Sequence, residues 1–180
     1  MKNLGVHIAR ILRHHPEAAG IALDEHGWAD VGELIEGVRR NGFTIDKDIL
    51  DKIVATDQKK RFAYNADETK IRANQGHSIP VDVGMEEKLP PSVLYHGTAE
   101  KYIESIRRNG ICKRTRNFVH LSLDEATAVK VGSRHGSPVV LKIDTGRMAT
   151  DGYKFFISAN GVWQTNYVPY DYVIEEIKPQ

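Results

Sequence analysis

The chain has 180 residues, 25 of them Lys or Arg and 24 Asp or Glu, which gives a formal net charge of +1. Its apolar content of 41% is too high, and its net charge too small, for a disordered chain. A single cysteine excludes a disulfide framework or a cysteine-based zinc cluster and favours a reducing, cytoplasmic location. No apolar run approaches the roughly 18 residues of a membrane span, and we expect no signal peptide.

The basic residues are unevenly distributed along the chain. No acidic residue lies between Glu104 and Asp124, a stretch that holds five basic residues: Arg107, Arg108, Lys113, Arg114 and Arg116. A polyanion responds to such a local cluster of positive charge, whatever the net charge of the chain. A nucleic-acid partner is therefore compatible with the near-neutral total, which predicts a short RNA footprint with a shallow salt dependence.

Residues 1–78 are predicted to form three helices and a hairpin. Apolar residues recur on one helix face at Leu4, Ile8, Ile11 and Leu12. Pro16 ends this helix, and Asp30 and Asp46 are expected to cap the next two. Residues 61–64 and 70–73 follow as two strands joined by a short polar loop. This order is typical of a winged-helix module, which often binds nucleic acid.

Prolines and glycines punctuate residues 79–92, which we expect to be a linker. Residues 93–180 then change character, because short β-type segments replace the helical periodicity. We expect a β-rich domain with two helices, at 99–108 and 124–131. The predicted strands lie at 93–96, 118–121 and 138–143, with further segments around 155–157, 161–168 and 172–177. The predicted fold class is therefore α+β, in two lobes.

Several short polar groups could carry chemistry. Arg13-His14-His15 closes the first helix, where a charged C-cap is the simplest interpretation. Lys59-Lys60-Arg61 is either an exposed basic turn or an anion site, and Gln75–Ser78 is either a hydrogen-bonded loop or a binding loop. Each group alone is ambiguous.

The second half holds two histidine-containing strands and an Arg-His pair. In Tyr95-His96-Gly97-Thr98, the glycine would admit a ligand close to the backbone. His120 and Ser122 lie on one side of their strand, because side chains alternate. Arg134-His135 is flanked by glycines, a layout suited to binding an anion, whereas Ser158–Trp163 is typical of a turn. The sequence has no P-loop or Rossmann pattern, and its histidines lack metal-ligand spacing.

Taken in order, these motifs resemble the NAD-dependent RNA 2′-phosphotransferases, the Tpt1/KptA family. The resemblance runs from Leu12-Arg13-His14 through Lys60-Arg61-Phe62 and Ile71–Ser78 to Tyr95–Thr98. It continues through Val119–Ser122 and Arg134–Leu141 to Ser158–Trp163. It implies two lobes: a winged-helix lobe at 1–78 that holds RNA 2′-phosphate, and an ADP-ribosyltransferase-like lobe at 93–180 that holds NAD.

The resemblance also implies residue roles. The implied catalytic set is Arg13, His14, Arg61 and Arg134. The implied RNA-phosphate-binding set is Arg13, His14, Arg61, Gln75, His77 and Ser78. The implied NAD-binding set is His96, Gly97, Thr98, His120, Ser122, Arg134 and Asn160. The site is expected between the lobes. NAD is consumed as a co-substrate, and we expect no metal, no membrane association and no obligate protein partner.

The implied reaction has two steps. An internal RNA 2′-phosphate, as at a tRNA splice junction, attacks C1″ of the nicotinamide riboside and expels nicotinamide. The neighbouring 2″-hydroxyl then attacks phosphorus, giving 2′-OH RNA and ADP-ribose 1″,2″-cyclic phosphate. The phosphate nucleophile is already anionic, so it needs positive charge rather than a base. The sequence fits this need, because residues 160–165 lack the glutamate usual in protein-modifying ADP-ribosyltransferases.

The chain departs from the family pattern at two positions. Phe118 stands where the family commonly has a histidine, and Arg114 or Arg116 could take over its contact with NAD pyrophosphate. His15 offers a second imidazole beside His14. Two alternative functions stay open: an ADP-ribosyltransferase that stops at the nucleic-acid adduct, and a non-catalytic winged-helix RNA-binding protein.

Overall fold

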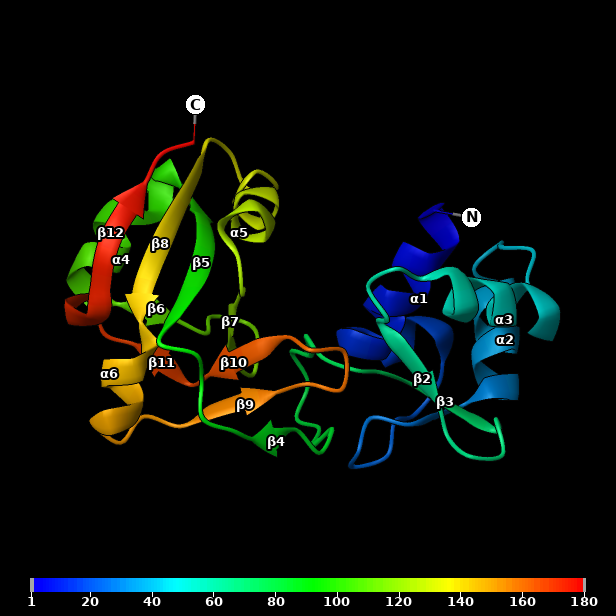
Figure 1. The fold of residues 1–180 in the computed structure, drawn as a ribbon. Helices are drawn as coiled ribbons and strands as arrows, with labels where there is room; N and C mark the ends of the chain where they lie inside the picture. Colours follow the sequence, from blue (N-terminus) through cyan, green and yellow to red (C-terminus); the bar gives the residue numbers. More distant parts are fainter. Residues whose placement is uncertain (1, 180) are drawn as a thin grey trace. The chain divides into compact units, whose positions relative to one another are not determined.

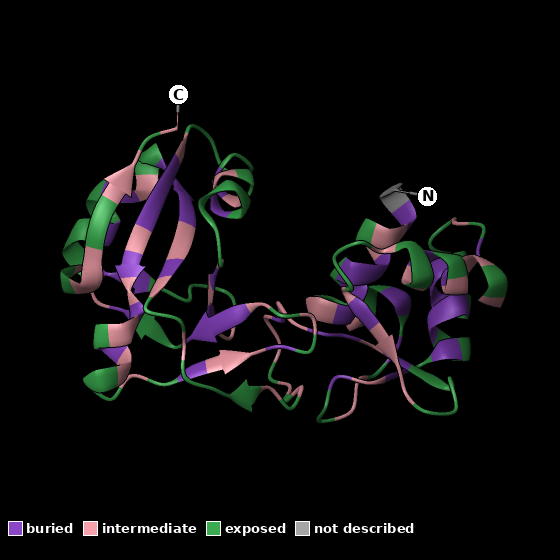
Figure 2. Cartoon of the chain, viewed as in Figure 1, coloured by how far each residue is buried: buried purple, intermediate pink, exposed green. Residues whose placement is uncertain are grey.

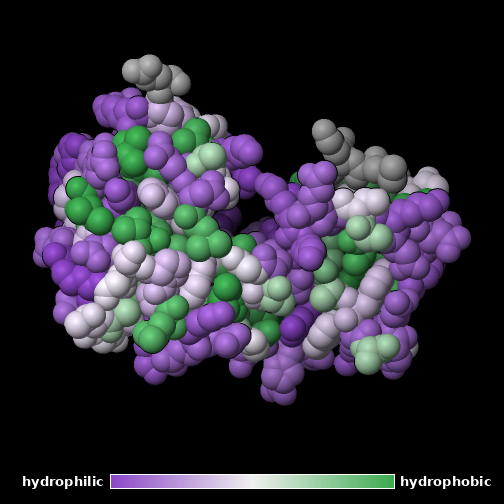
Figure 3. All heavy atoms as spheres, viewed as in Figure 1, coloured by the Kyte–Doolittle hydropathy of each residue, from purple (hydrophilic) through white to green (hydrophobic). Residues whose placement is uncertain are grey.

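The computed structural model describes residues 2–179 and divides the chain into two compact units, Met1–Gly84 and Met85–Gln180 (Figure 1). The described residues form six α-helices and twelve short strands in antiparallel sheets, so the α+β class is confirmed. On the face drawn in Figure 3, hydrophobic and hydrophilic residues are interspersed over each unit. The helices of the described region are all too short or too polar to cross a membrane.

The first unit consists of three α-helices and a small sheet. Its elements in order are α1 (Lys2–Arg13), a 3-10 turn (Pro16–Ala19), β1 (Ala29–Asp30), α2 (Val31–Arg40), α3 (Lys47–Thr56), β2 (Phe62–Tyr64) and β3 (Lys70–Ala73). Asp30 caps α2 by accepting the N–H of Glu33 at 2.9 Å, and Asp46 caps α3 through the N–H of Ile49 at 2.8 Å. Both predicted caps and the hairpin are confirmed.

One apolar core fills the first unit. The three helices contribute residues such as Ile8, Leu34 and Leu50, each 0% exposed. Phe62 and Ile71 add to this core from the sheet, whose strand order is β1-β3-β2. Because strand side chains alternate, Arg72 and its partner Ala63 lie on the opposite, outer face of the sheet.

The second unit is richer in strands. Its elements up to α5 are β4 (Glu86–Glu87), β5 (Val93–Ala99), a 3-10 turn (Glu100–Tyr102), α4 (Ile103–Asn109), β6 (Ile111–Cys112), β7 (Val119–Leu121) and α5 (Glu125–Gly132). The remaining elements are β8 (Pro138–Asp144), α6 (Thr145–Thr150), β9 (Phe155–Ile157), β10 (Trp163–Thr165), β11 (Tyr167–Val168), a 3-10 turn (Tyr170–Tyr172) and β12 (Val173–Ile177). The sheets have the orders β4-β9-β10-β7, β12-β8-β5 and β11-β6. The central strand β8 is largely buried (Figure 2).

The structure corrects the sequence prediction in three places. Helix α6 was not expected, because residues 145–150 contain Gly146 and no clear apolar period; Asp144 caps it through the N–H of Arg147 at 2.9 Å. The helix predicted at 99–108 begins as a 3-10 turn and becomes α-helical at Ile103. Strand β5 extends to Ala99, well past His96, because it pairs with β8 along its whole length.

Gly97 is required by packing between β5 and α5. A Cβ at this position would lie 1.8 Å from the carbonyl oxygen of Ala128, an impossible approach. Gly132 faces the same contact from the other side, since its Cβ would lie 2.5 Å from the carbonyl oxygen of Thr98. The backbones of strand and helix therefore touch directly, which accounts for Gly97 without any ligand.

Gly97→Ala is expected to destabilise the second unit by about 3 kcal/mol or more, because overpacking of a backbone contact has no side-chain relief. The measurement is thermal or urea unfolding followed by Trp163 fluorescence in a Trp28→Phe background. Gly5→Ala is the control: a Cβ there would meet only Ile53 Cγ2 at an ordinary 3.5 Å. An unchanged midpoint for Gly97→Ala would contradict this account of the contact.

Candidate active site

In the first unit, the end of α1 and the loop after β3 hold each other. Ser78 donates its backbone N–H at 3.0 Å to the carbonyl of Arg13, one of the carbonyls at the end of the helix. The hydroxyl of Ser78 lies 2.8 Å from Nδ1 of His14. Gly76 has φ +88°, which favours glycine, and a Cβ there would lie 3.6 Å from the Arg13 guanidinium carbon. Arg13, His14 and the loop 75–78 thus form one cluster.

His77 sits in this cluster as an uncharged ring among cations. Its side chain is buried, with the residue 3% exposed, and burial is the main cause that lowers the pKa of His77 to about 4. The charges of Arg13, His14 and Arg72 lower this pKa in the same direction. Within the described residues, Nε2 of His77 has no hydrogen-bond partner. A neutral histidine can pack against arginines without adding to their mutual repulsion.

Arg61 is held at three points in the same unit. The Asp57 carboxylate accepts the backbone N–H of Arg61 at 2.6 Å and its Nη1 at 2.5 Å, and the Asp57 side chain is only 8% exposed. The N–H of Asn74 donates to the Arg61 carbonyl at 2.8 Å. A guanidinium has five N–H donors in a rigid fork. Asp57 therefore fixes one edge of Arg61, and the guanidinium has further donors that could bind an anion.

In the second unit, His96 and His120 meet across neighbouring strands. A ring nitrogen that faces a carbonyl must donate, so Nδ1–H of His96 donates to the carbonyl of His120 at 3.0 Å. Removal from water is the largest cause that lowers the pKa of His96, followed among the lowering causes by the nearby charges of Arg116 and Arg114. The ring is therefore neutral near pH 7, and its Nε2 is an acceptor suited to a ribose hydroxyl.

Arg116 joins this group from the segment before β7. Since an arginine N–H can only donate, Nδ1 of His120 accepts from Nη1 of Arg116 at 3.1 Å, which places the proton of a neutral His120 on Nε2. Partial removal from water and the positive charge of Arg134 lower the pKa of Arg116. Two arginines close enough to oppose each other's charge favour an anion beside them.

The other residues predicted to bind NAD lie at the end of β7, in the β9–β10 turn and on β5. Ser122 pairs with Tyr95 through two backbone hydrogen bonds, of 2.7 and 2.9 Å, which joins β7 to β5. Asn160 lies in the β9–β10 turn, where the Ser158 hydroxyl donates to its Oδ1 at 2.6 Å. The antiparallel register places this turn at the Ser122 end of β7. Thr98 is buried beside α5, like Gly97.

Phe118, a position where the resemblance leads one to expect a histidine, has a packing role. Its ring centroid lies 5.6 Å from that of Phe156 on β9, a tilted aromatic contact. The cation nearest to it along the chain is Arg116, and Arg114 instead stacks on Tyr102 with its guanidinium 4.3 Å from the ring. The structure therefore favours Arg116 over Arg114 as the additional cation beside His120.

Three residues beside the candidate groups of the two units escaped the sequence analysis or received no role of their own. Arg116 was noted only as a substitute for a missing histidine, and its place in a basic run was the available signal. Asp57 carried no signal, because an acidic residue beside a phosphate site runs against simple charge matching. Gln164 lies opposite His120 in the β7–β10 ladder, is 2% exposed, and has no partner for Nε2 among the described residues.

The described residues include no group of three His, Cys, Asp or Glu side chains arranged to hold a metal ion. Each unit instead gathers arginines with neutral or hydrogen-bonded histidines. This donor set suits phosphate, because guanidinium groups bind phosphate oxygens bidentately. Such an arrangement is typical of a protein that binds phosphate-bearing ligands.

Comparison with known proteins identifies the family. Residues 2–167 match the family described as RNA 2′-phosphotransferase, Tpt1 / KptA family. A probable RNA 2′-phosphotransferase of Flavobacterium johnsoniae is 51% identical over 96% of this chain and 94% of its own. Proteins of the same description from Fusobacterium nucleatum and Escherichia coli are 49% and 48% identical, over 94% and 91% of this chain and 96% and 89% of theirs. The chain belongs to the Tpt1/KptA family of NAD-dependent RNA 2′-phosphotransferases.

The pKa of His77 predicts acid sensitivity of the first unit. Because the folded pKa of about 4 lies below the unfolded value of about 6.5, the unfolded state binds more protons between these values. The contribution of neutral His77 to the free energy of unfolding is fully present above pH 6.5. It falls by about 2 kcal/mol between pH 7 and pH 5.

The test compares wild type with His77→Gln by urea unfolding at pH 7 and pH 5. Trp28 fluorescence in a Trp163→Phe background reports the first unit alone. The stability difference between the two proteins should shift by about 2 kcal/mol in favour of the variant at pH 5. A difference that does not depend on pH would show that His77 keeps an ordinary pKa.

Proposed function

We propose that the chain removes an internal 2′-phosphate from RNA by transferring it to NAD, in two steps. The supporting observation is that Asn74, which follows β3, bonds to the Arg61 carbonyl, while Ser78 in the same loop bonds to Arg13 and His14. These groups offer several fixed N–H donors to one phosphate. We infer that the first unit binds the RNA phosphate as a winged-helix lobe, because its three helices and hairpin follow in the order typical of that module.

The second unit is proposed to hold NAD as an ADP-ribosyltransferase-like lobe. In this assignment, neutral His96 accepts a ribose hydroxyl at Nε2, and His120 donates from its own Nε2. Arg116 and Arg134 neutralise phosphate oxygens. The supporting observations are the His96–His120 hydrogen bond and the hydrogen bond from Arg116 to His120. Ser122 and Asn160 flank this group at one end of β7.

In the first step, an oxygen of the RNA 2′-phosphate forms a bond to C1″ as the bond to nicotinamide breaks, and nicotinamide leaves with the electron pair. In the second, the 2″-hydroxyl attacks phosphorus and the RNA 2′-oxygen leaves, taking up the proton that the hydroxyl loses. His14 is assigned to move this proton, because its Nδ1 is positioned by Ser78. Arg13, Arg61 and Arg134 stabilise the charge on the phosphate oxygens.

The activity test uses NAD and a short RNA that carries one internal 2′-phosphate. The expected products are 2′-OH RNA, nicotinamide and ADP-ribose 1″,2″-cyclic phosphate, identified by mass. An RNA product that keeps ADP-ribose would support an enzyme that stops at the adduct. RNA binding with no NAD binding by calorimetry would support a non-catalytic RNA-binding protein.

Arg134→Ala and Arg116→Ala test separately the two arginines of the second unit that are proposed to neutralise phosphate oxygens. Loss of one fixed cation at a phosphate in the transition state is expected to lower kcat by about 10²–10³-fold. Arg134→Ala should also accumulate ADP-ribosylated RNA when the second step is slowed more than the first. The measurement is single-turnover kinetics with both products resolved. Wild-type rates in one variant would remove that arginine from the site.

Asp57→Ala tests how Arg61 is positioned. Without the carboxylate, the guanidinium loses its fixed orientation, and kcat is expected to fall by about 10²-fold with the KM for NAD unchanged. Asp57→Asn keeps an acceptor for the backbone N–H and should recover part of the loss. Glu36→Ala is the matched control, because Glu36 pairs with Arg39 at 2.7 Å on the exposed surface of α2. Equal kinetics in Asp57→Ala and the control would refute the positioning role.

A further inference from the structure

The outer face of the β1-β3-β2 sheet carries an arginine stacked on a tryptophan. The guanidinium carbon of Arg72 on β3 lies 4.5 Å from the centre of the Trp28 ring, which precedes β1. Both side chains are partly buried. An arginine on an aromatic ring loses much of its freedom to rotate, while the edge of its guanidinium stays able to donate hydrogen bonds.

Arg72 lies next to the residues proposed to hold the RNA 2′-phosphate. It pairs with Ala63, two residues after Arg61, and Asn74 bonds to Arg61 one step further along the same ladder. Arg61 and Arg72 are therefore diagonal neighbours on one face, where Cβ atoms lie about 7–8 Å apart. The charge of Arg72 also reaches buried His77, together with the charges of Arg13 and His14.

The Arg72 guanidinium has little to bind within the protein. In residues 4–179 its only hydrogen bond runs from Nη1 to the His26 carbonyl, at a long 3.4 Å, and its buried Nε has no partner. No ion pair in this range involves it. Removal from water is the largest effect on the pKa of Arg72 and lowers it, whereas the negative charges of Asp24 and Asp82 raise it.

Those two carboxylates are engaged elsewhere. Asp24 accepts the backbone N–H groups of His26 and Trp28, at 3.0 and 2.9 Å, and pairs with Lys70 at 3.3 Å. Asp82 accepts the N–H of Gly84 at 2.9 Å. A partly buried, oriented arginine without an acidic partner has guanidinium N–H groups that can bind an external anion.

We propose that Arg72, oriented by Trp28, binds the phosphodiester on the 3′ side of the nucleotide that carries the 2′-phosphate. This inference rests on the proposed function. The 3′-oxygen and the 2′-oxygen are attached to neighbouring carbons of one ribose. The phosphodiester on the 3′-oxygen is therefore the anion nearest to the 2′-phosphate. Arg61 and its diagonal neighbour Arg72 match two such anions, one arginine to each.

The experiment uses three short RNAs of one sequence, which differ only around the phosphorylated ribose. The first carries an internal 2′-phosphate, the second ends in a 2′-phosphate with a free 3′-hydroxyl, and the third ends in a 2′,3′-bisphosphate. The third RNA supplies the 3′ charge without a downstream nucleotide. Steady-state KM for RNA, kcat and KM for NAD are measured for wild type, Arg72→Ala, Arg72→Lys and Trp28→Ala.

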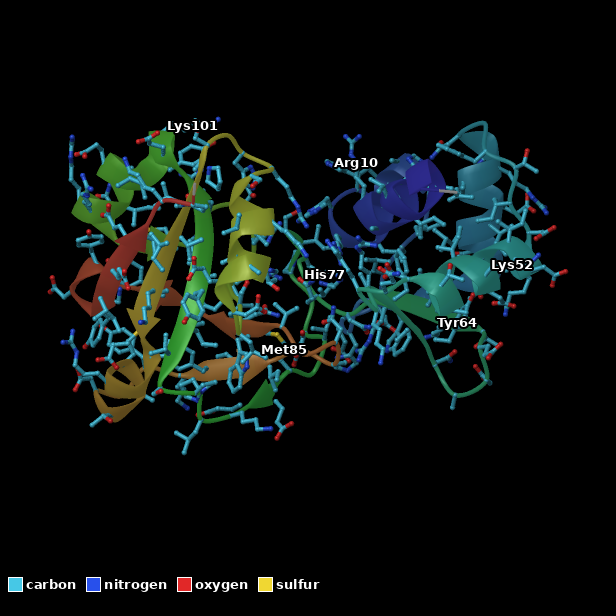
Figure 4. All side chains as sticks on the ribbon, turned by 45° about the horizontal axis from the view of Figure 1, so that its top comes forward. Arg10, Lys52, Tyr64, His77, Met85 and Lys101 are labelled. Atoms are coloured by element: carbon cyan, nitrogen blue, oxygen red, sulfur yellow. The ribbon has the colours of Figure 1, made fainter. Side chains whose placement is uncertain are left out.

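For wild type, the first and third RNAs should have a KM at least about 10-fold lower than the second, the effect of a charge-assisted hydrogen bond. In Arg72→Ala this advantage should disappear, with the KM for NAD unchanged. Arg72→Lys should keep part of it, and Trp28→Ala should lose part through misorientation of Arg72. Exposed Lys52, labelled in Figure 4, gives the charge control, since Lys52→Ala should behave as wild type.

Each result decides between explanations. An advantage retained in Arg72→Ala overturns the proposal. So does an advantage that needs the downstream nucleotide and is absent with the bisphosphate, because that result points to base stacking. A role in folding alone would lower the thermal midpoint and alter all three RNAs equally. No transfer by wild type from the first RNA would instead refute the proposed function itself.

Discussion

The site in the first unit depends on one closure, in which the loop after β3 folds back on the last turn of α1. Ser78 supplies both a backbone donor for the Arg13 carbonyl and a hydroxyl for His14, across 64 residues of sequence. Such a closure carries an entropic cost that the surrounding core must offset. Without this closure, Arg13 and His14 would not be held beside the loop 75–78. A bound phosphate would then have to order these side chains itself.

Histidines in both units are kept neutral, chiefly by burial. The positive charges of nearby arginines lower the pKa of each imidazole further. His96 then donates a hydrogen bond to the His120 carbonyl, and His77 packs as a neutral ring (His77 is labelled in Figure 4). The phosphate chemistry fits such surroundings, because its nucleophile is already an anion and needs charge neutralisation more than a base.

Sequence signals that depend on nearby residues predicted the helices and the hairpin of the first unit well. Caps at Asp30 and Asp46, the Pro16 stop and the hairpin depend on neighbours a few residues away, which the sequence displays directly. Residues whose place depends on distant contacts were harder to find. Asp57 matters through its hold on Arg61, and Arg116 through its contact with His120, neither of which a linear pattern displays. Gly97 was read as an opening for a ligand, whereas the carbonyl of Ala128 fills that space. Helix α6 was missed because its cap, not an apolar period, defines it.

The contact at Gly97 also limits what can move in the second unit. Where two backbones touch, no layer of side chains remains to slide or repack, so α5 and β5 behave as one rigid piece. Arg134 follows α5 by two residues, and the N–H groups of Arg134 and His135 still bond to the last turn, at 3.3 and 2.9 Å. The reach of Arg134 is therefore set by the rotation of its own side chain. If Arg134 contacts a phosphate in both steps of the proposed reaction, it would follow the phosphate by rotamer changes, because its backbone is fixed to α5.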